Sequence, residues 1–142
     1  MKFNSQICTT RSQSEALLKL GLKKETADCY LFEYEKGKYK VIAEPWLDLI
    51  EDEKYYSQYK DVCFPAWSLG RLIETMPNNI HKYNDIADLS VSNELVQYRF
   101  YDVDYNHDVC LEHFNDGTLY DNIIDCIEWL IKEGYFNKEY LV

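Results

Sequence analysis

The sequence has few of the features that usually identify a defined chemistry. Its 142 residues include only three histidines, three prolines and five glycines. No G-x-G-x-x-G or Walker A loop is present, which excludes nucleotide binding by those two routes. No G-x-S-x-G elbow is present either, so the sequence offers no serine nucleophile of that type. The sequence therefore indicates no catalytic residue and no cofactor.

The cysteines do not form a motif. They are odd in number and widely scattered, at Cys8, Cys29, Cys63, Cys110 and Cys126. No C-x-x-C pair occurs, which excludes a zinc ribbon and a thioredoxin-like motif. Each cysteine lies in or beside an apolar run, so we expect buried, unreactive thiols.

The sequence also lacks long apolar segments. Its first ten residues, MKFNSQICTT, contain no apolar region typical of a signal peptide. No run approaches the roughly 20 apolar residues that a membrane helix needs. We therefore expect a cytoplasmic protein with reduced thiols and no membrane association.

Basic residues are outnumbered by acidic ones. There are 25 Asp and Glu against 15 Lys and Arg, which gives a formal net charge of −10. Such a surface repels phosphate, so no nucleic-acid partner is expected. It suits a basic protein partner. DNA mimicry by the acids is a further hypothesis, although lysines such as Lys19, Lys23 and Lys24 interrupt them.

What the sequence does contain is a set of short helix and strand patterns. Residues 10–21 have capping-box signals at Thr10 and Ser12, apolar residues on one face, and Gly21 where a helix would end. Residues 118–134 form the strongest amphipathic pattern, with Thr118 as a cap and Gly134 at the C-terminal end. A third helix is predicted after Pro65, which we place in its first turn, ending before Pro77.

Strand patterns fill most of the remaining sequence. Residues 29–34 and 38–43 predict a β-hairpin around Glu35-Lys36-Gly37. Residues 87–92, 95–103 and 109–114 predict further strands, and residues 78–85 predict a polar loop. Residues 46–59 predict an irregular helix with Leu47 and Ile50 facing inward. The sum is one α+β domain over residues 1–142, with an antiparallel sheet of four or five strands, about three helices, and the C-terminal helix packed on the sheet.

One turn could hold a metal ion. In the segment FYDVDYNHDVCLEHF, the residues at 102, 104 and 106 match the first three ligand positions of a calcium loop. However, His107 replaces the required glycine and His113 replaces the closing glutamate. A plain hairpin turn needs fewer assumptions. The metal alternative, with or without enzyme activity, uses Asp102, Asp104, Asp108 and His107.

The aromatic residues have two interpretations: the rings cover the core of a small domain, which is the simpler interpretation, or they form a binding surface. Thirteen tyrosines and three tryptophans are present, and Trp, Tyr and Arg dominate the energetics of protein interfaces. Trp67 falls off the apolar face of the predicted helix, so we expect it to be partly exposed. The predicted protein-binding surface comprises Trp46, Tyr55, Tyr56, Tyr59, Trp67 and Arg71. A homo-oligomer that buries these aromatics against a second copy is also expected.

Three stretches taken together resemble a group of proteins. They are ICTTRSQSEALLKLGLKKETADCY, FPAWSLGRLIETMP and YDNIIDCIEWLIKEGYF, and in this order they resemble small uncharacterised proteins of gut-bacterial prophages and mobile elements. The resemblance implies a setting and no activity or site residue. The sequence as a whole thus predicts a small acidic interaction or modulator protein that binds an unknown protein partner.

Overall fold

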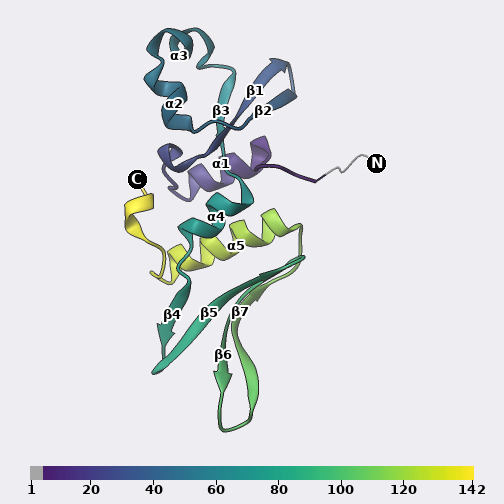
Figure 1. Cartoon of the computed structure of the whole chain (residues 1–142), viewed down its shortest axis with the longest axis vertical. Helices are drawn as coiled ribbons and strands as arrows, with labels where there is room; N and C mark the ends of the chain where they lie inside the picture. Colours follow the sequence, from purple (N-terminus) through teal and green to yellow (C-terminus); the bar gives the residue numbers. More distant parts are fainter. Residues whose placement is uncertain (1–4) are drawn as a thin grey trace. The chain divides into compact units, whose positions relative to one another are not determined.

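The computed structural model describes residues 5–142 and confirms the α+β class (Figure 1). The chain divides into two compact units, and each is described here by itself. Unit 1 comprises Met1–Ile73 with Lys138–Val142, and unit 2 comprises Glu74–Asn137. The prediction of one domain stays a prediction, because two compact units can belong to one domain.

The sheet of unit 1 has three antiparallel strands in the order β2-β1-β3. The strands are β1 (Cys29–Glu35), β2 (Lys38–Ile42) and β3 (Cys63–Ala66). The predicted hairpin is confirmed, with Gly37 at φ +75° in its turn, a conformation that glycine adopts without strain. Side chains alternate between the two faces of the sheet. Leu31 is aligned with Val41 and Phe64 on one face, whereas the preceding residue, Tyr30, is aligned with Ile42 and Pro65 on the other.

The third predicted helix begins later than expected. Pro65 lies in strand β3 rather than in a first helical turn, and the helix α4 runs over Leu69–Thr75. The prediction was wrong because β3 is the outer strand of its sheet, where a proline costs no ladder hydrogen bond. The pairing partner of Pro65 is Tyr30, 35 positions earlier, so no local pattern shows it.

Residues 46–59 form two short helices instead of one. They are α2 (Trp46–Glu51) and α3 (Glu53–Tyr59), separated at Asp52, whose carboxylate accepts the Tyr55 N–H at 3.0 Å. Trp46 and Leu49 are the buried residues of α2. Leu47 is 42% exposed, so its predicted inward orientation is wrong. Trp46 and Leu49 are three residues apart, so they share one helical face. This face is displaced by one residue from the predicted face of Leu47 and Ile50.

The N-terminal segment is tied to the chain after β3. The Thr9 N–H donates to the Trp67 carbonyl at 2.9 Å, and the Trp67 N–H donates to the Thr9 hydroxyl at 3.0 Å. Thr10 then caps α1 (Arg11–Lys19) in a capping box with Gln13, as its sequence predicts. A 3₁₀ turn, η1 (Lys24–Thr26), leads into β1, and a second, η2 (Lys138–Tyr140), closes the unit.

Unit 2 contains a four-stranded antiparallel meander in the order β4-β5-β6-β7. Its strands are β4 (Asn79–Lys82), β5 (Asp85–Ser92), β6 (Leu95–Asp102) and β7 (His107–Phe114). The polar loop predicted at residues 78–85 is wrong in part, since residues 79–82 pair with β5. A two-residue turn of Tyr83 and Asn84, both with positive φ, makes this hairpin possible.

The last helix, α5 (Leu119–Lys132), packs on β6 and β7 as predicted. Thr118 and Asp121 form its capping box, and Gly134 follows it at φ +77°. Trp129 contacts the rings of Tyr98 and Phe114 on the sheet, with centroid separations of 5.9 and 6.1 Å. Over residues 5–142, no helix has the length and apolar character needed to cross a membrane.

Candidate functional site

The predicted aromatic surface is not a single surface. Trp67 is fully buried, and its indole N–H donates to the Thr26 hydroxyl at 2.9 Å. The partial exposure expected for Trp67 is therefore wrong, because the helix whose apolar face it was judged against begins only at Leu69. Trp46 is also buried, at 3% exposure. Arg71 lies exposed on α4.

The three tyrosines of this set pack in and beside α3. Tyr56 contacts the Trp46 ring edge to face at 6.0 Å, and Tyr59 contacts Phe32 on β1 at 5.8 Å. Tyr55 packs against Tyr59 at 4.5 Å and keeps 38% of its surface exposed. The binding role of these residues stays a prediction.

The segment 102–108 comprises the turn of the β6–β7 hairpin and the strand residues on either side of it, as the simpler interpretation predicted. The Asp102 carboxylate accepts the N–H groups of Asp104 and Tyr105 at 3.0 and 3.3 Å, which is a turn stabilised by its own side chain. Asp108 pairs with Arg99 at 3.2 Å, and the His107 ring nitrogen lies 3.2 Å from the Tyr105 carbonyl oxygen. Within residues 5–142, no group of three or more His, Cys, Asp or Glu side chains is arranged to hold a metal ion.

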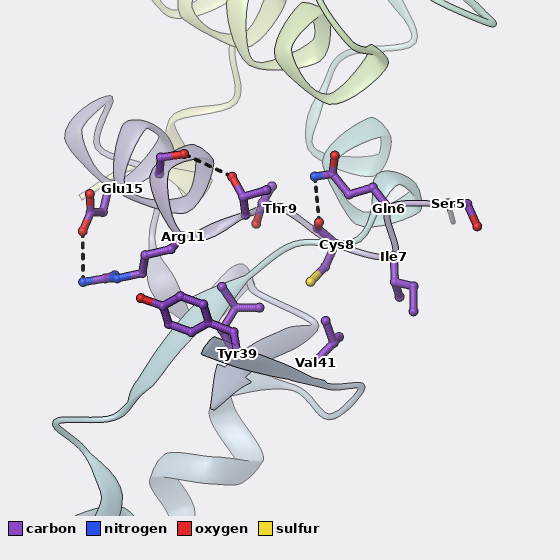
Figure 2. A pocket seen from close by; sticks show the side chains of 12 residues that line it. Ser5, Gln6, Ile7, Cys8, Thr9, Arg11, Glu15, Tyr39 and Val41 are labelled. Atoms are coloured by element: carbon purple, nitrogen blue, oxygen red, sulfur yellow. Dashed lines mark hydrogen bonds and ion pairs between the residues drawn. The ribbon is translucent and has the colours of Figure 1, made fainter. Parts of the chain in front are cut away.

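Unit 1 contains an apolar hollow of about 600 Å³, which we call the groove. It lies between the N-terminal segment with the start of α1 and one face of the β1–β2 hairpin (Figure 2). The sheet contributes Leu31, Tyr39 and Val41, and the chain before α1 contributes Ile7 and Cys8. Val41 is 39% exposed and Ile7 is 64% exposed. The groove therefore presents apolar side chains that residues 5–142 leave partly uncovered.

The two charged side chains that line the groove pair with each other. Arg11 pairs with Glu15 at 3.0 Å, and its guanidinium lies over the Phe64 ring, 3.5 Å from the centroid. The pair carries no net charge. Burial raises the pKa of the Cys8 thiol to about 12, with smaller contributions from Cys29 and Asp28, so this thiol stays protonated at neutral pH. The groove thus has the chemistry of an apolar binding surface.

A second hollow of about 380 Å³ lies on the opposite face of the same sheet, and we call it the tyrosine–carboxylate cavity. The strands supply Tyr30 and Ile42, whose neighbours Leu31 and Val41 line the groove. The chain from Glu44 to the start of α3 supplies the other wall. The lining residues are Tyr30, Ile42, Glu44, Asp48, Leu49, Asp52 and Tyr55.

Carboxylates and phenol groups dominate this cavity. Three of its seven lining residues are acidic and none is basic. Burial raises the pKa of Tyr30 to about 12, with further contributions from Tyr55, Glu44 and Cys63. Burial is also the largest cause of the raised pKa of Tyr55. Smaller contributions come from Cys63, Tyr59, Glu44 and Asp52. Both phenols therefore remain neutral hydrogen-bond donors at physiological pH.

Sequence reasoning found only Tyr55 among the residues of the two hollows. A partial signal for the cavity was present, because Glu44, Asp48 and Asp52 recur every four residues, which is helical spacing. Only Asp48 lies within α2, and the other two lie just outside its ends. Nothing local indicated that these acids would lie beside Tyr30. The groove had a weaker signal, the alternation of Tyr39 and Val41 with lysines along β2.

The other predicted buried thiols are mostly confirmed. Cys29, Cys63 and Cys126 are buried like Cys8, and burial raises the pKa of each. Cys110 is exposed on β7, so its predicted burial is wrong. Cys110 is paired with Arg99 in the β6–β7 ladder, and both residues are exposed.

Comparison with protein-family models, with curated proteins and with solved structures finds no match. The resemblance to prophage and mobile-element proteins depends on the three sequence stretches alone and stays a prediction.

Proposed function

We propose that this is a non-catalytic interaction protein that binds an extended apolar segment of a partner protein in the groove. The observation that carries the proposal is the apolar groove open beside the outer strand β2. The cytoplasmic location and the phage or mobile-element setting belong to the same proposal. They are motivated by the five scattered cysteines, all of them free thiols, and by the three resembling stretches.

The lining of the groove supports an apolar occupant. Covering the exposed parts of Ile7 and Val41, together with the half-buried ring of Tyr39, removes apolar surface from water. Each square ångström so covered contributes about 25 cal/mol to binding before the costs of association. The Arg11–Glu15 pair adds no net charge at the rim, so a charged group would gain little there.

The edge of β2 supports a polypeptide rather than a small apolar molecule. β2 lies at the end of the order β2-β1-β3, and among residues 5–142 no strand pairs with its outer edge. An unpaired edge offers backbone N–H and C=O groups to an added strand. Because Tyr39 and Val41 project from β2 into the groove, an added strand would bring its alternate side chains to the same face.

The wall opposite β2 is held in place, which favours binding with little rearrangement. Two hydrogen bonds join Thr9 to Trp67, and Thr9 also shares a hydrogen bond of 2.7 Å with Ser14. Cys8 forms an isolated bridge with Ser68 next to them. A binding surface that is already formed avoids the entropy cost of ordering it.

The test is selection of peptides from a random-sequence display library on the purified protein. We expect the selected peptides to contain apolar residues at alternate positions and to bind in a fluorescence-polarisation assay. The Val41→Asp variant places a charge in the groove and is expected to weaken binding at least tenfold, about 1.4 kcal/mol. Thermal melting of the variant shows whether the fold is retained.

The matched control is Lys40→Thr. Lys40 is the neighbouring exposed residue of the same strand, and its side chain lies over Tyr34 on the other face. We expect this variant to bind the selected peptides like the parent protein. Peptides without apolar residues, or peptides that bind the Val41→Asp variant equally well, would contradict the proposal. Binding of an apolar dye with no peptide selected would favour a small apolar ligand instead.

A further inference from the structure

The side chains that line the groove differ between its two ends. Arg11 and Tyr39 lie together at one end, where both contact the ring of Phe64. Ile7 and Val41 lie toward the other end (Figure 2). The groove therefore joins an end that combines a cation with aromatic rings to an end that presents aliphatic side chains.

The guanidinium of Arg11 is held in place by two contacts. Its Cζ lies 3.5 Å from the centroid of the Phe64 ring, and its Nη2 pairs with the Glu15 carboxylate at 3.0 Å. Phe64 in turn meets Tyr39 edge to face, with 6.1 Å between the ring centroids. The contact with Phe64 covers one face of the planar guanidinium, while 31% of the Arg11 side chain stays exposed. A ligand in the groove can therefore stack only on the second face.

An aromatic ring is the group that gains most at this end of the groove. A guanidinium attracts the π-face of an aromatic ring, and the attraction grows when the pair is shielded from water. Arginine also stacks flat on rings, because its planar guanidinium is weakly hydrated. The edge of such a ring can contact Tyr39, since aromatic pairs favour edge-to-face geometry. A carboxylate gains less, because Glu15 already neutralises Arg11.

The spacing along β2 determines where this ring must lie in the partner segment. Tyr39 and Val41 are two residues apart on one face of the strand, a separation of about 6.8 Å. An added strand has the same repeat, so the residues that face Tyr39 and Val41 are also two positions apart. One of them meets the end of the groove with Arg11, and the other meets the end with Ile7.

We propose that the partner segment carries an aromatic residue facing Arg11 and Tyr39, and an aliphatic residue two positions away facing Val41 and Ile7. Arg11 is then the residue that determines the preference for an aromatic ring. The inference rests on the proposed function and deepens it. A groove that bound apolar segments without this preference would leave the proposed function intact.

The first test is the composition of the peptides selected on the purified protein from the display library. We expect Phe, Tyr or Trp at one of the alternate apolar positions, and Val, Ile or Leu two positions away. Selected apolar peptides without aromatic enrichment would overturn the inference and leave the proposed function standing. A library that yields no binding peptide would overturn both.

The second test measures the contribution of the π-face. The tightest peptide is made with either phenylalanine or cyclohexylalanine at the aromatic position, because cyclohexylalanine keeps the apolar bulk and lacks the π-face. We expect the cyclohexylalanine form to bind the parent protein about fivefold more weakly in fluorescence polarisation. On the Arg11→Met variant, the two forms should bind within about twofold of each other. Equal binding to the parent protein, or an undiminished preference in the variant, would overturn the inference.

The variant Arg99→Met provides the matched control. Arg99 is an exposed arginine of β6 outside the groove, and it pairs with Asp108 at 3.2 Å. The same substitution there removes the same charge and one exposed ion pair, so the preference for phenylalanine should remain. Loss of the preference in both variants would reveal an effect of net charge and would overturn the inference. Thermal melting confirms folding, and methionine suits the helical position of Arg11.

Discussion

The two faces of the β2-β1-β3 sheet offer opposite chemistries to solvent. One face presents the groove, where Leu31, Tyr39 and Val41 meet the N-terminal segment and the Arg11–Glu15 pair carries no net charge. The other presents the cavity, where Tyr30 and Ile42 meet three carboxylates. Adjacent residues of β1 and β2 thus line different sites. The comparison teaches that strand alternation alone can place an apolar and an acidic site on one small sheet.

The largest expected effect comes from removing a core residue of the groove face. Leu31 is 4% exposed and packs with Cys8, Cys29 and Ala66. We expect Leu31→Ala to lower the free energy of unfolding by about 2–5 kcal/mol, because it leaves a void in this cluster. Urea denaturation followed by circular dichroism measures the loss. Tyr30→Phe is the matched change on the other face, and it should cost under about 0.5 kcal/mol at neutral pH, because its hydroxyl has no hydrogen bond to lose. Equal losses would contradict the difference between the faces.

A smaller effect distinguishes the two buried tryptophans. The Trp67 N–H is hydrogen-bonded to Thr26, whereas the Trp46 N–H is buried without a partner among residues 5–142. Trp67→Phe should therefore destabilise the protein by about 1–3 kcal/mol more than Trp46→Phe, which removes an unsatisfied donor. Both changes remove similar volume, so each variant controls for the other. Thermal and urea unfolding provide the measurement, and a larger loss for Trp46→Phe would contradict the assignment.

The smallest effect is a pH dependence that belongs to the cavity face. Burial raises the pKa of Tyr30 from 10.0 to about 12 in the folded protein. The unfolded chain therefore loses this proton first as the pH rises, so the stability contribution of Tyr30 is complete below pH 10 and is lost between pH 10 and 12. Between pH 9 and 11, the parent protein should lose about 1 kcal/mol more than Tyr30→Phe. Parallel urea titrations at the two pH values test this, and identical losses in both proteins would show that the Tyr30 phenol is not buried from solvent.

The elements that the sequence predicts correctly are the ones that local contacts build. The capping boxes at Thr10 and Thr118 bond residues three apart, and the β1–β2 turn is closed by Gly37 at positive φ. Such signals are complete within a few residues, so the helices α1 and α5 and the first hairpin follow from them.

The elements that the sequence misses depend on distant partners. Pro65 belongs to a strand because Tyr30 pairs with it, and the indole of Trp67 is buried against Thr26. The cavity has the same origin, since the acids at 44, 48 and 52 recur with helical spacing, which does not indicate the strand that lies beside them. Local periodicity indicates which side chains share a face, whereas the sheet register decides what that face meets.

The hydrogen bonds between Thr9 and Trp67 also have a consequence for the order of folding. They join residues 58 positions apart, whereas all cavity residues lie within the continuous segment from Tyr30 to Tyr55. Closing the longer loop costs more chain entropy, and contacts of large sequence separation slow folding. We therefore expect the cavity to form early with the hairpin, and the groove to be completed only when residues 5–15 pack against the finished sheet.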